Sequence, residues 1–288
     1  MFAVYKREFK AYMTNVYGWM FMAVLLLFVG FMMFLENLVS GAPVIEYALL
    51  GSEYVLILLV PVLCMRSMAE DKRNKTDMFY LSLPIKTSAV VLGKYFALLT
   101  VYALPCAVTA VYPVILGMFG TVNFVGAYSS LFHFFLLGAA LIAVCQFMSG
   151  LTDNLVVAAV LGVLAVLLLF AAPLVGYMLP DLPLISFVGL LVLSALAAGL
   201  AYLTTRSLTV TVITAALLVL PLSVLYMVKA ELFAGLLPSL LEWISPFVHF
   251  ESASSYGLFS IPAVILLLSY PVFFVFLTVL SADKKRWA

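Results

Sequence analysis

The chain has 288 residues, of which 66% are apolar and only 9% are charged, and its formal net charge is +1. So apolar a composition excludes an ordinary soluble domain and indicates an integral membrane protein. The small net charge gives no sign of nucleic-acid binding, because in a membrane protein the positions of the charges matter more than their sum. Cys64, Cys106 and Cys145 lie within apolar runs and lack metal-ligand spacing, so they are expected to be small buried residues.

The N-terminal stretch, residues 1–15, has the pattern of a helix that lies flat on a membrane surface. At helical spacing its apolar side chains share one face, namely those of Phe2, Tyr5, Phe9, Tyr12 and Met13. Three basic residues, Lys6, Arg7 and Lys10, fall outside that face, where they can meet anionic lipid headgroups. The pattern predicts an interfacial helix in contact with the lipid bilayer. A cytosolic tail that only supplies positive charge is the alternative.

Long apolar runs occupy most of the remaining chain and predict a polytopic bundle of transmembrane helices. About eight runs are long enough to cross a bilayer, at residues 16–35, 48–65, 95–119, 131–150, 155–179, 184–204, 208–228 and 258–280. Pro105 and Pro113 are expected to kink the third run. The less hydrophobic stretch 230–257 contains an apolar segment too short to cross, which predicts an extracytoplasmic re-entrant or surface helix. The expected fold is a single all-α membrane domain, residues 1–288.

The most strongly charged interior stretch runs from Arg66 to Lys94. A charge at the centre of a bilayer costs at least about 2.5 kcal/mol, so this stretch must face water. Its alternating charges, its interspersed apolar residues and the stop at Pro84 predict a short amphipathic helix within residues 66–84. We expect this segment to contact a soluble partner on the cytosolic side. An ordinary solvated loop is the alternative.

The basic residues also predict the orientation of the chain. Placing the N-terminus in the cytosol brings every lysine and arginine except Lys229 to the cytosolic side of an eight-span topology. The sequence therefore predicts a multi-pass protein of the cytoplasmic (inner) membrane with both termini in the cytosol.

Motifs that carry chemistry are missing from the sequence. It contains no phosphate-binding loop, zinc-protease motif or serine-nucleophile elbow, and its two histidines, His133 and His249, lie in different segments. We therefore expect no catalytic residue, no metal site and no enzymatic activity. An ion-coupled secondary carrier also fits poorly, because Glu53 and His133 are placed near the ends of their predicted spans.

Short motifs with a characteristic order run along the chain, at residues 5–12, 65–66, 69–77, 83–84, 93–94, 152–154, 245–246, 249–251 and 285–287. In order and spacing they resemble the membrane subunit of an ATP-binding-cassette (ABC) exporter of the ABC-2 class. The resemblance is nearest to the permeases linked to bacterial gliding motility and multicopper-enzyme maturation. That family usually has six spans, so the hairpin 184–228 would be an addition to it.

The resemblance implies specific partners and contacts. The first helix would be the family's elbow helix, and residues 66–84 would hold the coupling helix that docks on a separate ABC ATPase subunit, which binds ATP and Mg²⁺. A second permease subunit, identical or different, would complete the pathway, and this chain would bind no cofactor itself. The implied ATPase-coupling residues are Glu70, Asp71, Lys72, Arg73, Thr76, Met78, Phe79, Leu81 and Pro84. The expected function is that of an exporter permease. A non-transporting membrane anchor or mechanotransmission subunit for an ABC ATPase, in an assembly or motility complex, is the alternative.

Overall fold

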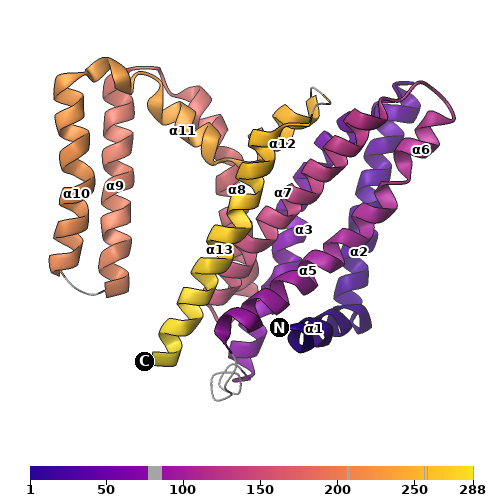
Figure 1. The fold of residues 1–288 in the computed structure, drawn as a ribbon, viewed down its shortest axis with the longest axis horizontal. Helices are drawn as coiled ribbons and strands as arrows, with labels where there is room; N and C mark the ends of the chain where they lie inside the picture. The colour runs from indigo at the N-terminus through magenta and orange to yellow at the C-terminus, as the bar shows by residue number, and fades with distance from the viewer. Residues whose placement is uncertain (77–85, 206–207, 256, 258, 288) are drawn as a thin grey trace. The chain divides into compact units, whose positions relative to one another are not determined.

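Figure 1 shows the computed structural model of the chain, in which residues 1–76, 86–205, 208–255, 257 and 259–287 are described. Helices make up nearly all of these residues and no strand occurs among them, so the predicted all-α class is confirmed. The chain divides into two compact units. The first consists of Met1–Leu168 and Pro246–Ala288, and the second of Leu169–Ser245.

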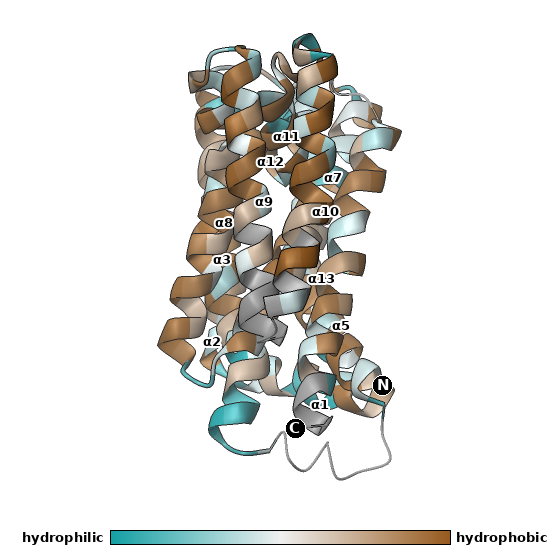
Figure 2. Cartoon of the chain, turned by 90° about the vertical axis from the view of Figure 1, so that its left-hand side faces the viewer, coloured by the Kyte–Doolittle hydropathy of each residue, from teal (hydrophilic) through white to brown (hydrophobic). Residues whose placement is uncertain are grey.

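The first unit is a bundle of long, mainly apolar helices. In chain order these are α1 (Phe2–Thr14), α2 (Val16–Met33) with the π-helix η1 (Phe34–Val39), α3 (Ile45–Arg73), α5 (Thr87–Thr109), α6 (Tyr112–Gly117), α7 (Phe124–Leu151), the first part of α8 (Leu155–Met178), α12 (Pro246–Ser255) and α13 (Ile261–Trp287). Figure 2 shows hydrophobic residues along the helices and hydrophilic residues towards their ends. Helix α1, the last turns of α3, the first turn of α5 and the C-terminal end of α13 lie at the same end of this unit (Figure 1).

Helix α7 forms the core of the first unit. In the most apolar 18-residue window of α7, 78% of the residues are buried, against 17–50% in the corresponding windows of the other helices that could span a membrane. Small residues allow this, because a Cβ added at Gly138 would overlap the ring of Tyr102 on α5. The Tyr102 hydroxyl donates a hydrogen bond to the carbonyl oxygen of Phe134 (2.8 Å), and the Tyr95 hydroxyl donates one to that of Ala139 (3.1 Å). Side chains of α5 are thus bonded directly to the backbone of α7.

Two helix boundaries bear on the sequence predictions. Helix α5 ends at Thr109 and α6 begins at Tyr112 with Pro113 in its first turn, so the third run is interrupted next to one of the two prolines predicted to kink it, whereas Pro105 lies inside α5. The span predicted to end at about residue 65 belongs to a helix, α3, that continues to Arg73, so the first part of the segment predicted to hold a short amphipathic helix is the end of α3. The hydrogen bonds of a helix do not depend on apolar side chains, so the helix continues where the charged sequence begins.

The second unit contains the rest of α8, the helices α9 (Pro183–Thr205) and α10 (Leu208–Val228), the 3₁₀-helix η2 (Ala230–Phe233) and α11 (Leu236–Ile244). Helices α9 and α10 lie side by side as the hairpin predicted for residues 184–228 (Figure 1). Three aromatic rings pack together at one end of the hairpin. Phe187 stacks on Tyr226 with ring centroids 4.3 Å apart, and Phe233 contacts both rings edge-on. Such aromatic contacts stabilise the hairpin beyond the apolar area that they bury.

Six helices among the described residues are long and apolar enough to cross a membrane. They correspond to the first five predicted spans and the last one. Helices α9 and α10 contain only shorter apolar stretches among the described residues, so the eight-span topology stays a prediction. The segment after α10 holds η2, α11 and α12, and its helical structure is interrupted at Ser245. If the helices on the two sides of this break are counted together as one bent span, they would supply a seventh crossing of the membrane. The predicted re-entrant character of residues 230–257 likewise stays a prediction.

Candidate functional site

The charged end of the first unit brings together α1, α3, α5 and the end of α7. The structure describes five of the residues predicted to couple to an ATPase, namely Glu70, Asp71, Lys72, Arg73 and Thr76. The four others, Met78, Phe79, Leu81 and Pro84, lie outside the described residues. The site can therefore be built from the charged helix end that precedes this segment.

The last turns of α3 carry an ion pair. The Arg66 guanidinium donates two hydrogen bonds to the Glu70 carboxylate, from Nε at 3.0 Å and from Nη2 at 2.7 Å. The guanidinium also lies over the ring of Tyr17, 4.5 Å from its centroid, at the start of α2. A forked pair of this kind has a fixed geometry and is stronger than a single contact. It therefore orients the side of α3 that faces α1 and α2.

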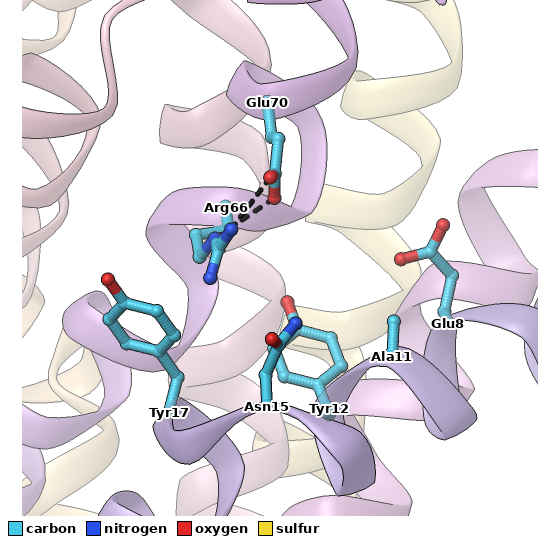
Figure 3. Close-up of a pocket in the computed structure, with 7 residues that line it drawn as sticks. All are labelled: Glu8, Ala11, Tyr12, Asn15, Tyr17, Arg66 and Glu70. Atoms are coloured by element: carbon cyan, nitrogen blue, oxygen red, sulfur yellow. Dashed lines mark hydrogen bonds and ion pairs between the residues drawn. The ribbon is translucent and has the colours of Figure 1, made fainter.

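A small cavity of about 40 Å³ lies beside this ion pair. Figure 3 shows Arg66 and Glu70 on α3 above it, and Glu8, Tyr12 and Tyr17 on α1 and α2 around it. The Tyr12 hydroxyl donates a hydrogen bond of 3.4 Å to the carbonyl oxygen of Leu63. Burial raises the pKa of the Tyr12 hydroxyl well above its ordinary value, so the group keeps its proton and remains a donor.

Lys94 of α5 carries a buried charge within the site, and only 3% of the residue is exposed. Its ammonium group lies 2.5 Å from Asp71 Oδ2 on α3 and 3.7 Å from Glu8 Oε1 on α1, and it donates a hydrogen bond to the carbonyl oxygen of Ser67. A buried ammonium group without such partners would be strongly unfavourable. One lysine therefore holds three helices together through two carboxylates and a carbonyl oxygen.

Helix α7 is fixed to the same part of α3. The Ser149 hydroxyl donates to the carbonyl oxygen of Met65 (3.1 Å) and lies within hydrogen-bond distance of the backbone amides of Met68 (3.2 Å) and Ala69 (3.1 Å). The Lys72 ammonium donates to the carbonyl oxygen of Gly150. Any displacement of the charged end of α3 would therefore also act on the core helix α7.

The C-terminus of α3 closes with a turn that has a left-handed residue. The amide of Thr76 donates to the carbonyl oxygen of Asp71 (2.9 Å) and the amide of Lys75 to that of Lys72 (3.1 Å), which is the Schellman pattern. Lys75 has φ of 57°, and the Thr76 hydroxyl donates to Asp71 Oδ1 at 3.0 Å. Asp71 therefore serves both the turn and Lys94.

We expect Lys75→Gly to stabilise the protein by about 1 kcal/mol, because glycine adopts the left-handed conformation without the steric cost that other residues pay. Lys75→Val should destabilise it, since a β-branched residue fits that conformation poorly. Thermal unfolding of the detergent-solubilised variants measures both effects. Equal stability of the two variants would contradict a left-handed turn at this position.

A helix, α1, occupies the stretch predicted to be an interfacial helix, and its side chains divide between two faces. Lys6, Arg7 and Lys10 are exposed, whereas Tyr12 is buried. The Tyr5 hydroxyl lies 3.2 Å from Thr100 Oγ1 on α5, so part of the apolar face packs on protein. Contact of α1 with lipid headgroups stays a prediction.

Three of the charges predicted to face a partner are used inside the chain. Glu70 pairs with Arg66, Asp71 with Lys94, and Lys72 with the backbone of α7, whereas Arg73 is exposed. The stretch from Arg66 to Lys94 was predicted to face water, and for Lys94 this is wrong, because Lys94 is buried and paired with two carboxylates. Glu8 was missed as a site residue. The position of Lys94 after Gly93, at the start of an apolar run, is the signal that could have indicated a buried lysine with a carboxylate partner.

The arrangement defines a class of protein: a multi-pass helical membrane protein with a charged, internally bonded end from which α3 and α5 emerge. Residues 4–208 match the sequence model of a family described as "ABC-2 family transporter protein". The chain therefore belongs to the ABC-2 transporter family, whose members are permease subunits of ABC transporters. No curated protein and no solved structure matches the chain. The matched range includes α9, and the motifs at residues 245–287 lie beyond it.

Proposed function

We propose that the chain is the permease subunit of an ATP-driven exporter and that residues 66–84 receive the motion of a separate ATPase subunit. The observation that carries the proposal is the family match over residues 4–208, which includes this segment. The family generally works with an ABC ATPase. ATP and Mg²⁺ would be bound by that partner, and this chain would carry out no bond chemistry.

The bonded end of the first unit supports this role. A force applied to α3 or α5 would be transmitted through Lys94, which joins both helices to α1. It would also be transmitted through Lys72 and Ser149, which join α3 to α7. Packed elements linked in this way move as bodies rather than bending locally. A push on residues 66–84 would thus reach the core of the membrane bundle.

Several finer features belong to the same proposal. A second permease subunit completes the pathway, both termini face the cytosol, and the chain falls within the gliding-motility and multicopper-enzyme-maturation permeases. The basic residues of α1, Lys6, Arg7 and Lys10, are exposed, and Arg7 is also paired with Glu8. Contact of this basic face with anionic lipid is part of the proposal. Transport rather than anchoring is the function that the family match favours.

The sharpest experiment is to purify the native complex by a tag on this chain, to identify the bound subunits and to replace the predicted apolar anchors. We expect an ABC ATPase to co-purify, and Phe79→Ala/Leu81→Ala to weaken its binding by about 2 kcal/mol, roughly 30-fold. A matched control is Leu38→Ala/Val39→Ala, which removes two exposed apolar side chains from η1 at the other end of the unit. Unchanged ATPase binding and transport in the first variant would refute the coupling role.

A further inference from the structure

A groove of about 70 Å³ lies between α2 and α3. Its walls are formed by the ring of Tyr17 and by apolar side chains, namely Met20, Phe21 and Val24 of α2 and Leu59, Val62 and Leu63 of α3. Met20 is 47% and Val24 38% exposed, so the groove opens on the surface of the bundle. Both helices are long and apolar enough to span a membrane. In a bilayer the groove would be filled by hydrocarbon, because an empty groove loses dispersion contacts.

The apolar groove continues into the small polar cavity beside the ion pair of α3. Tyr17 lines both spaces. On α3 the lining residues follow one another at helical spacing, from Leu59 through Leu63 to Arg66. On α2 the groove extends from Tyr17 to Val24, which is about 10 Å of helix. The two spaces therefore form one site with an apolar part and a polar end.

The polar end offers hydrogen-bond donors that the ion pair does not use. Arg66 donates to Glu70 from Nε and Nη2 only. Its third nitrogen, Nη1, points away from Glu70 into the space between Tyr17 and Asn15, and the Asn15 side chain points towards the guanidinium (Figure 3). A guanidinium has five N–H donors in a geometry that matches a phosphate group. The free side of Arg66 can therefore bind a phosphate.

The charges at the polar end are balanced. Glu8 also lines the cavity, but its carboxylate is already paired with Arg7 and Lys94. This leaves Arg66 and Glu70 as one positive and one negative group. An ionised carboxylate has about four acceptor positions, of which Arg66 occupies two on Glu70. The pair therefore matches a headgroup that carries both a phosphate and an amine, and it suits a purely anionic headgroup less well.

We propose that one zwitterionic phospholipid with a primary amine, of the phosphatidylethanolamine type, binds at this site. Part of an acyl chain lies in the groove between α2 and α3, the phosphate accepts from Arg66, and the amine donates to Glu70. The bound lipid joins the start of α2 to α3. This site is distinct from the basic face of α1, and the inference does not depend on an ATPase or on export.

The first test is native mass spectrometry of the full chain in detergent, after addition of phosphatidylethanolamine, phosphatidylglycerol or phosphatidylcholine. We expect one phosphatidylethanolamine to be retained per chain, with an affinity about tenfold higher than that of the other two lipids. Phosphatidylglycerol lacks the amine, and the quaternary amine of phosphatidylcholine has no N–H to donate. Equal retention of the three lipids, or tighter binding of phosphatidylglycerol, would refute recognition of this headgroup.

A substitution in the groove tests the position of the acyl chain. In Val24→Trp the larger side chain fills the groove, so the affinity for phosphatidylethanolamine should fall about tenfold. The matched control is Leu27→Trp, because Leu27 lies on the same helix, is 70% exposed and does not line the groove. It should bind the lipid as the unmodified protein does. If the two variants bind the lipid equally well, the acyl chain does not lie in this groove.

A double substitution tests the polar end. Arg66→Gln/Glu70→Gln removes both charges together and leaves neither of them without its partner. The variant should still hold a lipid through the groove, but it should lose the preference for phosphatidylethanolamine over the other two lipids. Circular dichroism checks that the variant remains helical. A preference that survives the double substitution would show that the headgroup binds elsewhere and would overturn the proposal.

Discussion

Lys94→Met is expected to destabilise the protein by about 3 kcal/mol, because removing one member of a buried ion pair leaves Asp71 without its positive partner, whereas Glu8 keeps its ion pair with Arg7. Methionine keeps most of the length of the side chain but removes the charge that Asp71 and Glu8 share. The last turns of α3 should then separate from α1 and α5, although the apolar core of the bundle persists. Unfolding in a denaturing detergent, followed by circular dichroism, measures the loss.

A second substitution should recover much of that stability. In Lys94→Met/Asp71→Asn the amide oxygen can still accept from Thr76, and the uncompensated charge is gone. The coupling free energy from this double-mutant cycle reports the ion pair itself. Lys86→Met is the matched control, since Lys86 is an exposed lysine just before α5 and should tolerate the change. If Lys94→Met is as stable as Lys86→Met, the buried pair does not hold the site together.

Gly138→Leu is expected to cost about 3 kcal/mol or more and to reduce the yield of folded protein, because it overfills the contact between α5 and α7. Even a Cβ at this position would overlap the ring of Tyr102, which is fully buried and hydrogen-bonded to the backbone of α7. The ring also contacts those of Phe21 and Phe135, so a shift of the ring would disturb these contacts as well. Yield and thermal unfolding of the detergent-solubilised protein measure the effect.

The control for this substitution lies in α9. Among the residues that the structure describes, no atom lies within 4 Å of a Cβ added at Gly199, so Gly199→Leu should be tolerated. Removing the ring as well, in Gly138→Leu/Tyr102→Ala, should restore part of the stability, since the leucine then fills the space left by the tyrosine. Equal destabilisation by both glycine substitutions would show that the close contact at Gly138 is not the cause.

The membrane-spanning helices were the most predictable part of the fold. Hydropathy identified the six helices that the structure offers as spans, because long apolar runs have few other stable states. Their ends were less predictable. The second run was expected to end at residue 65, where charges begin, whereas α3 continues to Arg73. Hydropathy reports where lipid ends and cannot report where backbone hydrogen bonding ends.

The sequence indicated which charged residues belong to the candidate site, but it did not indicate which of them are bonded to each other. The sequence placed Glu70, Asp71 and Lys72 in a charged segment next to a span, but it could not indicate that all three are bonded within the chain. Their partners come from other helices, and only three-dimensional packing selects which buried lysine meets which carboxylate. Lys94 and Glu8 were missed for that reason.

The attachment of α1 through Glu8 and Tyr5 has a consequence for the biosynthesis of the protein. Helix α1 is synthesised before α5, which carries Lys94 and Thr100, the partners of these two side chains. Until α5 has been inserted, Glu8 and Tyr5 lack these partners, although Tyr12 of α1 can already contact Leu63 on α3. The attachment of α1 to the bundle is therefore completed only after α2, α3 and α5 have all been synthesised.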